Sequence, residues 1–326
     1  MINEKIELAI IGAGRWGFNH VRTALSLLPA EKITVCDASD ASLARVAELD
    51  KNINTVKSLD EVLTKDSINV VIVATPAETH YAIAKQTLLA GKNTFVEKPI
   101  TLKSEDAEEL LQLAEEKNLK LMVGHILLYH PAILRIKKEI ENGKIGNLQY
   151  IYSNRLNLGA LRSEENILWS FAPHDISIIQ YFTGSNPVSI KSNGATFLQH
   201  DIEDTTLTFL SYPDNVHAHI FVSWLSPFKE QKLVIVGDAG MFVFEDTLQT
   251  DKLKFFPKGF KKVNGAFEKF DGDFEVVEFQ PGQPLQEEQK HFFEAVLNDT
   301  KPVTDGKHAL EVLKILEEAH RCLKQE

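Results

Sequence analysis

Cysteine is scarce in this chain of 326 residues, and the two that occur, Cys36 and Cys322, lie far apart and in no motif. This excludes a disulfide-stapled framework and leads us to expect a reducing, cytoplasmic environment. Long apolar runs are also missing, since no stretch reaches the roughly 18 apolar residues that a membrane helix needs. The apolar run within residues 1–14 is short and soon meets glycines, so we expect neither a signal peptide nor a membrane partner.

Positive charge is in short supply as well. The chain has 35 Lys and Arg residues against 46 Asp and Glu, a formal net charge of −11. An acidic surface repels phosphate backbones, so nucleic acid is not expected as a partner, whereas a small phosphorylated ligand needs only a local basic pocket. With 44% apolar residues and no internal repeat, the length fits two folded domains of ordinary size.

The first motif follows a short apolar run at residues 6–11 and has the sequence GAGRWG. Gly12 permits a tight turn, Gly14 lets the backbone approach a pyrophosphate, and Gly17 lets the following helix pack closely on the strand. The free N–H groups of that helix would face the phosphates. An ordinary glycine turn is the alternative, but the position between a strand and a helix favours a dinucleotide site.

The next expected strand, KITVCD, ends in Asp37, at the place where an acid accepts hydrogen bonds from the adenosine ribose. A carboxylate there repels a 2′-phosphate, and residues 38–44 contain no arginine to offset it. We therefore expect NAD in preference to NADP. Further along, Ser58 and Glu61 have the spacing of a capping box that starts a short helix.

Apolar strands alternate with amphipathic helices as far as residue 125, which predicts a parallel sheet covered on both faces. Ligands of such sheets bind beyond the carboxyl ends of the strands. The residues expected at those ends are Gly12 to Gly17, Asp37, Thr75, Pro76, Glu97, Lys98, Pro99 and His125.

The segment FVEKPI raises the question of why a buried strand should end in Glu97, Lys98 and Pro99. Its position predicts that Lys98 lies at the nicotinamide end of the cofactor. The alternative is a solvated lysine at the start of a loop, with Glu97 as its partner.

After His125 long alternating segments separated by turn residues predict a mainly antiparallel sheet. The fold class is thus an α/β Rossmann domain, residues 1–124, followed by an α+β domain, residues 125–326, which binds substrate and oligomerises. The last helix could pack back on the first domain. Residues 251–273 give no assignment.

His174 stands in NILWSFAPHDIS, between Pro173 and Asp175, at the expected start of a helix. It is a candidate catalyst, and a packed core histidine is the alternative. Arg155 and Arg162 flank NRLNLGALR and could clamp a diphosphate or a carboxylate, or simply form surface ion pairs. No metal site is expected, because the histidines near residue 218 lack a third ligand.

The segments GAGRWG, ATPAETH, FVEKP, VGH and the HD at 174 together resemble the Gfo/Idh/MocA family of sugar and inositol dehydrogenases over essentially the whole chain. The resemblance implies a Rossmann domain with an open-faced sheet domain, and hydride transfer between a sugar hydroxyl carbon and NAD(P). It implies that Lys98 lies at the reacting hydroxyl and that His174 accepts its proton.

The chain departs from the family pattern in two places. The acid often found four residues before the histidine is Ser170 here, and GHILLYHP puts Leu128 and His130 where an arginine and an asparagine are usual. NRLNLGALR and ENILWSFAPHD are similar to the branch that oxidises UDP-N-acetylglucosamine or its uronic acid at C3, for amino sugars of surface polysaccharides. The alternatives are a free sugar or inositol dehydrogenase and a non-catalytic dinucleotide-binding regulator.

The predicted catalytic residues are Lys98 and His174. Those predicted to bind the cofactor are Gly12, Gly14, Arg15, Trp16, Gly17, Asp37, Thr75, Pro76, His80, Glu97 and Lys98. Those predicted to bind a nucleotide-sugar or sugar substrate are His125, Arg155, Asn157, Arg162 and Asp175. Because few helices follow residue 200, one sheet face should stay uncovered and pair with a second copy, giving a dimer or tetramer.

Overall fold

The computed structural model describes residues 5–159 and 161–324. The chain divides into two compact units, unit 1 with Met1–Tyr129 and Gln283–Leu313, and unit 2 with His130–Gly282 and Lys314–Glu326. The sequence places the boundary between residues 124 and 125, assigns residues 125–326 to the second domain, and allows the last helix to pack back on the first. In the structure the segment Gln283–Leu313 belongs to unit 1 instead, and the division falls within the last helix.

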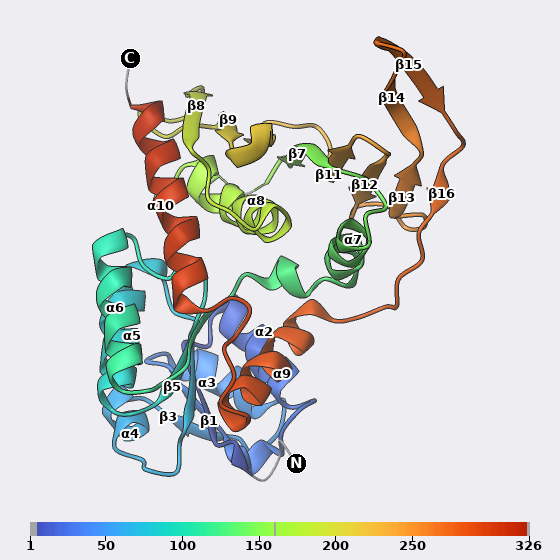
Figure 1. Cartoon of the computed structure of the whole chain (residues 1–326). Helices are drawn as coiled ribbons and strands as arrows, with labels where there is room; N and C mark the ends of the chain where they lie inside the picture. The colour runs from blue at the N-terminus through green and yellow to red at the C-terminus, as the bar shows by residue number, and fades with distance from the viewer. Residues whose placement is uncertain (1–4, 160, 325–326) are drawn as a thin grey trace. The chain divides into compact units, whose positions relative to one another are not determined.

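Unit 1 is built on a six-stranded sheet with the order β3-β2-β1-β4-β5-β6, in which every pair is parallel (Figure 1). This is the strand order of the dinucleotide-binding Rossmann fold, as predicted. All residues of β1, β2 and β4 are buried, which explains why these strands are apolar apart from Thr34. The strands are β1 (Leu8–Ile11), β2 (Ile33–Cys36), β3 (Asn54–Val56), β4 (Val70–Val73), β5 (Asn93–Val96) and β6 (Leu121–Val123).

Helices connect these strands and α9 packs against α2. The Ser58–Glu61 capping box is present at the start of α4, as the sequence predicts. The helices of unit 1 are α2 (Arg15–Ala24), α3 (Asp40–Ala47), α4 (Leu59–Leu63), α5 (His80–Leu89), α6 (Ser104–Glu116), α9 (Pro284–Leu297) and the first turns of α10 (Gly306–Leu323), with short 3-10 turns at Ala30–Lys32, Ala77–Thr79 and Ile126–Tyr129.

Unit 2 contains an eight-stranded sheet with the order β16-β13-β12-β11-β7-β10-β9-β8. Only β7 and β10 run parallel, so the predicted mainly antiparallel sheet is confirmed. Helix α8 packs on β7, β9 and β10, and α7 packs on α8. The elements are α7 (Pro131–Glu141), β7 (Leu148–Leu156), α8 (Ile167–Thr183), β8 (Ser189–Ala195), β9 (Thr205–Ser211), a 3-10 turn (Pro213–Asn215), β10 (His217–Ser223), β11 (Glu230–Gly237), β12 (Met241–Glu245), β13 (Leu253–Phe256) and β16 (Glu275–Val276).

Helix α8 starts earlier than the sequence suggests. Asn166 caps it by accepting a hydrogen bond from the backbone N–H of Trp169, and Pro173 lies inside the helix. The expectation that His174 stands at a helix start is therefore wrong. A capping asparagine outweighs the usual tendency of proline to mark a helix boundary, because the segment before Pro173 is apolar and buried.

The segment 251–273, for which the sequence gives no assignment, contributes β13, which lies between β12 and the edge strand β16. It also forms a separate hairpin of β14 (Lys258–Val263) and β15 (Ala266–Asp271) (Figure 1). Its strands are largely exposed. Strand β8 was not expected either, because its sequence SIKSNGA has few of the residues that favour strands.

Candidate active site

The glycine loop after β1 has the shape that a pyrophosphate requires. Gly12 adopts a φ of +91°, and a Cβ there would lie 2.8 Å from the carbonyl oxygen of Ala74. A Cβ on Gly17 would lie 1.8 Å from the carbonyl oxygen of Gly12, whereas one on Gly14 would meet nothing within 4 Å. The loop is thus closed toward the sheet and open at Gly14, and α2 begins with no acidic residue in its first turn. These residues fit a dinucleotide phosphate.

Asp37 holds this loop from the end of β2. Its carboxylate accepts a 2.6 Å hydrogen bond from the backbone N–H of Ala13 and a 2.8 Å bond from that of Ser39. Residues 38–44 contain no arginine, but the next residue, Arg45, reaches the loop. Its guanidinium donates to the Ala13 carbonyl oxygen at 2.8 Å and stacks on the ring of Phe18. A cation does therefore lie beside the Asp37 loop.

His80 links the ends of two neighbouring strands. Its Nε2 lies 2.9 Å from the carbonyl oxygen of Thr75 after β4, and its Nδ1 lies 2.7 Å from that of Pro99 after β5. The imidazole is 1% exposed. His80 therefore connects the loops that follow β4 and β5. Its role with the cofactor stays a prediction, and His80 would exert that role by holding these loops in place.

Glu97 and Lys98 occupy the carboxyl end of β5, and the Lys98–Pro99 peptide bond is cis. One carboxylate oxygen of Glu97 lies 2.7 Å from Nε2 of His20, and the other accepts the backbone N–H of Lys98 at 3.2 Å. Burial by itself would raise the pKa of Glu97, but the hydrogen bond from His20 and the positive charge of Lys98 outweigh it and lower the pKa. Glu97 is therefore an ionised carboxylate beside the Lys98 ammonium.

A second carboxyl group, Glu288 of α9, lies within electrostatic range of Glu97. It is fully buried, and neither oxygen has a hydrogen-bond partner in the part of the chain that the structure describes. Burial, and then the charge of Glu97, raise the pKa of Glu288 well above its ordinary value. Burial and a negative charge nearby both disfavour a second carboxylate charge, so Glu288 favours its neutral form.

The neutral Glu288 makes folding stability depend on pH. Its pKa is raised by folding, so its contribution is fully present below the unfolded value of about 4.3 and is lost as pH rises toward the folded value. Glu288→Gln removes this loss. We therefore expect the free energy of unfolding of the variant to exceed that of wild type by an amount that grows from pH 5 to pH 8. Urea unfolding at several pH values measures it, with the exposed neighbour in Glu287→Gln as the control. Parallel curves for wild type and Glu288→Gln would contradict the prediction.

His125, after β6, is 2% exposed and packs edge-on against His308 with the ring centroids 5.3 Å apart. Burial first, then His308 and Lys98, lower its pKa well below the ordinary value. Within residues 5–159 and 161–324, neither ring nitrogen has a hydrogen-bond partner. Both ring nitrogens are buried in this structure, and the predicted contact of His125 with substrate stays a prediction.

In unit 2 the predicted substrate residues Arg155 and Asp175 bond to each other. The Nε and one terminal nitrogen of Arg155 lie 2.8 and 3.0 Å from the two carboxylate oxygens of Asp175, which also accepts the Ser153 hydroxyl at 2.5 Å. Burial would lower the pKa of Arg155, but Asp175 outweighs it and raises it. Asp175 is 1% exposed. Much of the Arg155 fork is therefore engaged within the protein.

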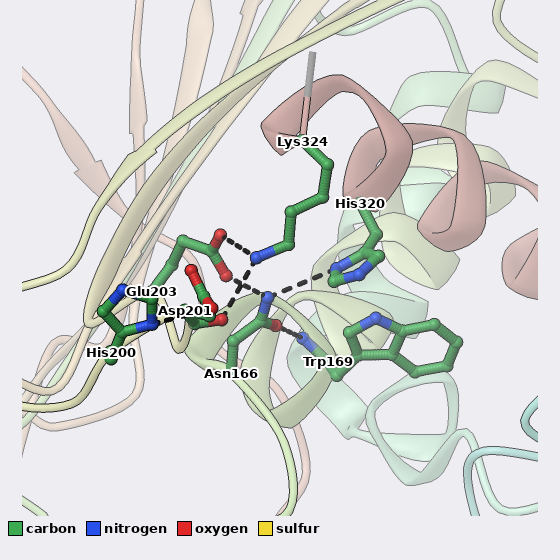
Figure 2. A network of polar contacts seen from close by, with 7 residues as sticks. All are labelled: Asn166, Trp169, His200, Asp201, Glu203, His320 and Lys324. Atoms are coloured by element: carbon green, nitrogen blue, oxygen red, sulfur yellow. Dashed lines mark hydrogen bonds and ion pairs between the residues drawn. The ribbon is translucent and has the colours of Figure 1, made fainter. Parts of the chain in front are cut away.

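His174, one position before Asp175, is half-buried on α8, and Ser170 occupies the preceding helical turn. The start of this helix is held by a polar network with the end of α10 (Figure 2). Asn166 donates to Glu203 at 2.5 Å and lies 3.3 Å from Nδ1 of His320, while Lys324 bonds to Glu203 at 2.7 Å. The network therefore fixes the N-terminal end of the helix that presents His174.

The other predicted substrate residues lie on the loop after β7. Arg162 is exposed, with its nearest ion-pair contact to Glu165 at 3.3 Å. Asn157 donates its backbone N–H to Ser223. Binding of substrate by these two side chains stays a prediction. Of the two arginines, Arg162 has the more accessible guanidinium, because that of Arg155 is bonded to Asp175.

The part of the chain that the structure describes contains neither a metal-binding cluster nor a membrane-spanning helix. In 5–159 and 161–324, no group of three or more His, Cys, Asp or Glu side chains is placed to hold a metal ion. Across the same described ranges, no helix is both long and apolar enough to span a membrane.

The Rossmann sheet, the glycine loop and the polar strand ends define a dinucleotide-dependent oxidoreductase. A family model described as "Oxidoreductase family, NAD-binding Rossmann fold" matches residues 6–125, and the model of the GFO/IDH/MocA C-terminal domain matches residues 133–243. The chain belongs to the Gfo/Idh/MocA family, and the prediction of a dehydrogenase that acts on CH–OH groups is confirmed.

Two known relatives are similar at modest identity. The scyllo-inositol 2-dehydrogenase (NAD(+)) of Bacillus subtilis is 25% identical over 316 residues, which cover 93% of this chain and 89% of the relative. The UDP-N-acetylglucosamine 3-dehydrogenase of Acidithiobacillus ferrooxidans is 29% identical over 186 residues, 57% of this chain and 56% of the relative. A solved structure of the latter enzyme matches with a TM-score of 0.84 over 97% of both chains at 23% identity, which demonstrates the shared fold.

Sequence reasoning missed four residues that the structure brings into play, namely His20, Arg45, Glu288 and Gln289. His20 alone had a local signal, since it follows Gly17 by three positions on the buried face of α2. Arg45 lies on α3, and Glu288 and Gln289 lie on α9. No spacing in the sequence indicates that these helices bring them to the glycine loop and to His20.

Proposed function

We propose that this dehydrogenase oxidises the C3 hydroxyl of a UDP-linked N-acetylated hexose or hexuronic acid, with NAD as hydride acceptor, in the synthesis of amino sugars for surface polysaccharides. The observation that carries the proposal is the polar end of β5, where Glu97 accepts the backbone N–H of Lys98, in a fold shared with a UDP-N-acetylglucosamine 3-dehydrogenase. Self-association into a dimer or tetramer, and a cytoplasmic location, stay predictions.

Two side chains would accept the hydroxyl proton and stabilise the negative charge of the developing alkoxide. Bound NAD supplies the nicotinamide that accepts the hydride. Lys98 donates a hydrogen bond to the reacting hydroxyl oxygen and stabilises the developing alkoxide, and His174 accepts the hydroxyl proton as the carbon becomes a carbonyl. Ser170 occupies the position of the acid often found in the family, so the role of that acid is not assigned to any residue here.

A second candidate is oxidation of a free sugar or an inositol. Two observations favour it. The inositol dehydrogenase relative spans more of this chain than the nucleotide-sugar relative does. Arg155, one of the two arginines expected to clamp a diphosphate, is bonded to Asp175.

A thermal-shift screen with NADH present separates these candidates. UDP-N-acetylglucosamine, its uronic acid, N-acetylglucosamine and inositols are each added at increasing concentration. A ligand at 100 times its Kd adds about 2.7 kcal/mol of stability, and we expect only the UDP-sugars to do so. Arg162→Ala should weaken this effect and leave NADH binding intact. Equal turnover of a free sugar and its UDP form would favour the second candidate.

The preference for NAD is tested at Asp37. Asp37→Ala removes a charged acceptor worth about 1.5–3 kcal/mol, so NAD affinity should fall by about one to two orders of magnitude. NADP should gain relative to NAD, because Arg45 stays beside the loop. Fluorescence titration measures both, and Asp37→Asn, which keeps an acceptor for the Ala13 N–H, serves as control. A wild-type protein that binds NADP more tightly than NAD would overturn the assignment.

A further inference from the structure

A buried polar array lies behind Lys98 in unit 1. It consists of His20 from α2, Glu97 after β5, and Glu288 and Gln289 from α9. The side chains of His20, Glu288 and Gln289 are all 0% exposed. None of these three can touch a ligand, so any influence on the chemistry passes through Glu97.

The hydrogen bonds assign the tautomer of His20. The side-chain nitrogen of Gln289 lies 2.9 Å from Nδ1 of His20 and 3.1 Å from the His20 carbonyl oxygen. Only an amide N–H group suits both contacts, because an amide oxygen would face the carbonyl oxygen. Nδ1 therefore accepts, and the ring proton sits on Nε2, which donates to Glu97 at 2.7 Å.

Glu97 connects His20 to the backbone of Lys98. Its second oxygen accepts the backbone N–H of Lys98 at 3.2 Å. The absence of a side chain at Gly124 makes room for the carboxylate, since a Cβ there would lie 3.0 Å from a Glu97 oxygen. A continuous chain of donors and acceptors thus runs from Gln289 through His20 and Glu97 to the backbone of Lys98.

Glu97 depends on these donors because its surroundings disfavour its charge. Its side chain is only 13% exposed, and the carboxyl group of Glu288 lies within electrostatic range of it. If His20 took the other tautomer, a lone pair on Nε2 would point at the carboxylate. Glu97 would then move away or lose its charge, and Lys98 would lose both its backbone anchor and its counter-charge.

We propose that His20 and Gln289 are positioning residues for Lys98, in which Gln289 sets the tautomer of His20 and His20 fixes the Glu97 carboxylate that anchors the Lys98 backbone. The effect on catalysis rests on the proposed role of Lys98. The anchoring of the Lys98 backbone by Glu97 does not depend on that role, and it can be measured without substrate.

The first arm of the test compares amide replacements of His20. The amide nitrogen of glutamine mimics Nε2 of histidine, whereas that of asparagine mimics Nδ1 and stops short of Glu97. We expect His20→Gln to keep kcat within about threefold of wild type, and His20→Asn to lower it by roughly 10- to 100-fold with the KM for NAD unchanged. Gln289→Leu should behave like His20→Asn, and Gln286→Leu on the same helix is its matched control. Equal kcat values for the two His20 variants would overturn the proposal.

The second arm uses NMR of the protein without substrate. Histidine ring ¹⁵N shifts should show the Nε2–H tautomer for His20 in wild type and a mixture in Gln289→Leu. The backbone amide proton of Lys98 should shift and exchange faster in His20→Asn than in His20→Gln. A wild-type Nδ1–H tautomer, or a Lys98 amide that is the same in both variants, would overturn the proposal even if no sugar is turned over. Absence of turnover in wild type with a normal NMR result would instead count against the proposed function alone.

Discussion

Lys98→Ala is expected to lower the rate of hydride transfer by about 10²–10⁴-fold, the usual cost of losing a positioned proton-transfer or charge-stabilising group. The physical reason is that the Lys98 ammonium, held beside the ionised Glu97, is the cation proposed to stabilise the developing alkoxide. His174→Ala should cost a similar factor. NADH should still bind to both variants, because neither side chain needs the adenosine half of the cofactor.

Single-turnover reduction of NAD with the chosen sugar measures these rates. Because both residues are proposed to act on the same hydroxyl, the double variant should be little worse than the poorer single variant. Lys103→Ala, an exposed lysine in the same connection, is the control. A Lys98→Ala enzyme that keeps more than about a third of the wild-type rate would leave Lys98 as a solvated lysine at a strand end.

Arg155→Ala is expected to destabilise the protein by about 3–5 kcal/mol, because it leaves the carboxylate of Asp175 buried without its partner. Urea unfolding measures this, and a second substitution, Asp175→Asn, should recover part of the loss by removing the buried charge. Arg162→Ala is the matched control, since its ion pair is exposed and should contribute about 0–1 kcal/mol. A stable Arg155→Ala variant that only binds the UDP-sugar less tightly would instead support the clamp.

These two results would also separate the roles of the arginines. The sequence suggests the same function for Arg155 and Arg162, because they flank one segment and have the same chemistry. The structure distinguishes them by burial and by the distance to the nearest carboxylate. A substrate effect should therefore appear at Arg162, and a stability effect at Arg155.

Much of unit 1 follows from contiguous residues. Apolar runs of strand length, amphipathic segments between them and the GAGRWG turn predict a parallel Rossmann sheet, and the structure confirms it. The capping box at Ser58 is confirmed for the same reason, since residues three apart in sequence meet whatever the rest of the chain does. In a parallel sheet the carboxyl ends lie on one edge, so the sequence also places Asp37, Thr75 and Lys98 there.

The tertiary structure alone decided which charges are buried and how they pair. Gln289 and His20 are 269 positions apart, and Glu97 and His20 are 77 apart, so no local pattern indicates that they bond. The same is true of Glu288, whose sequence context is that of an ordinary exposed helix position. Local patterns arise from dihedral preferences and periodicity within a few residues. The charge and orientation of Glu97 arise instead from groups that only the packing of α2 and α9 brings together, in a dry interior where each donor and each charge counts.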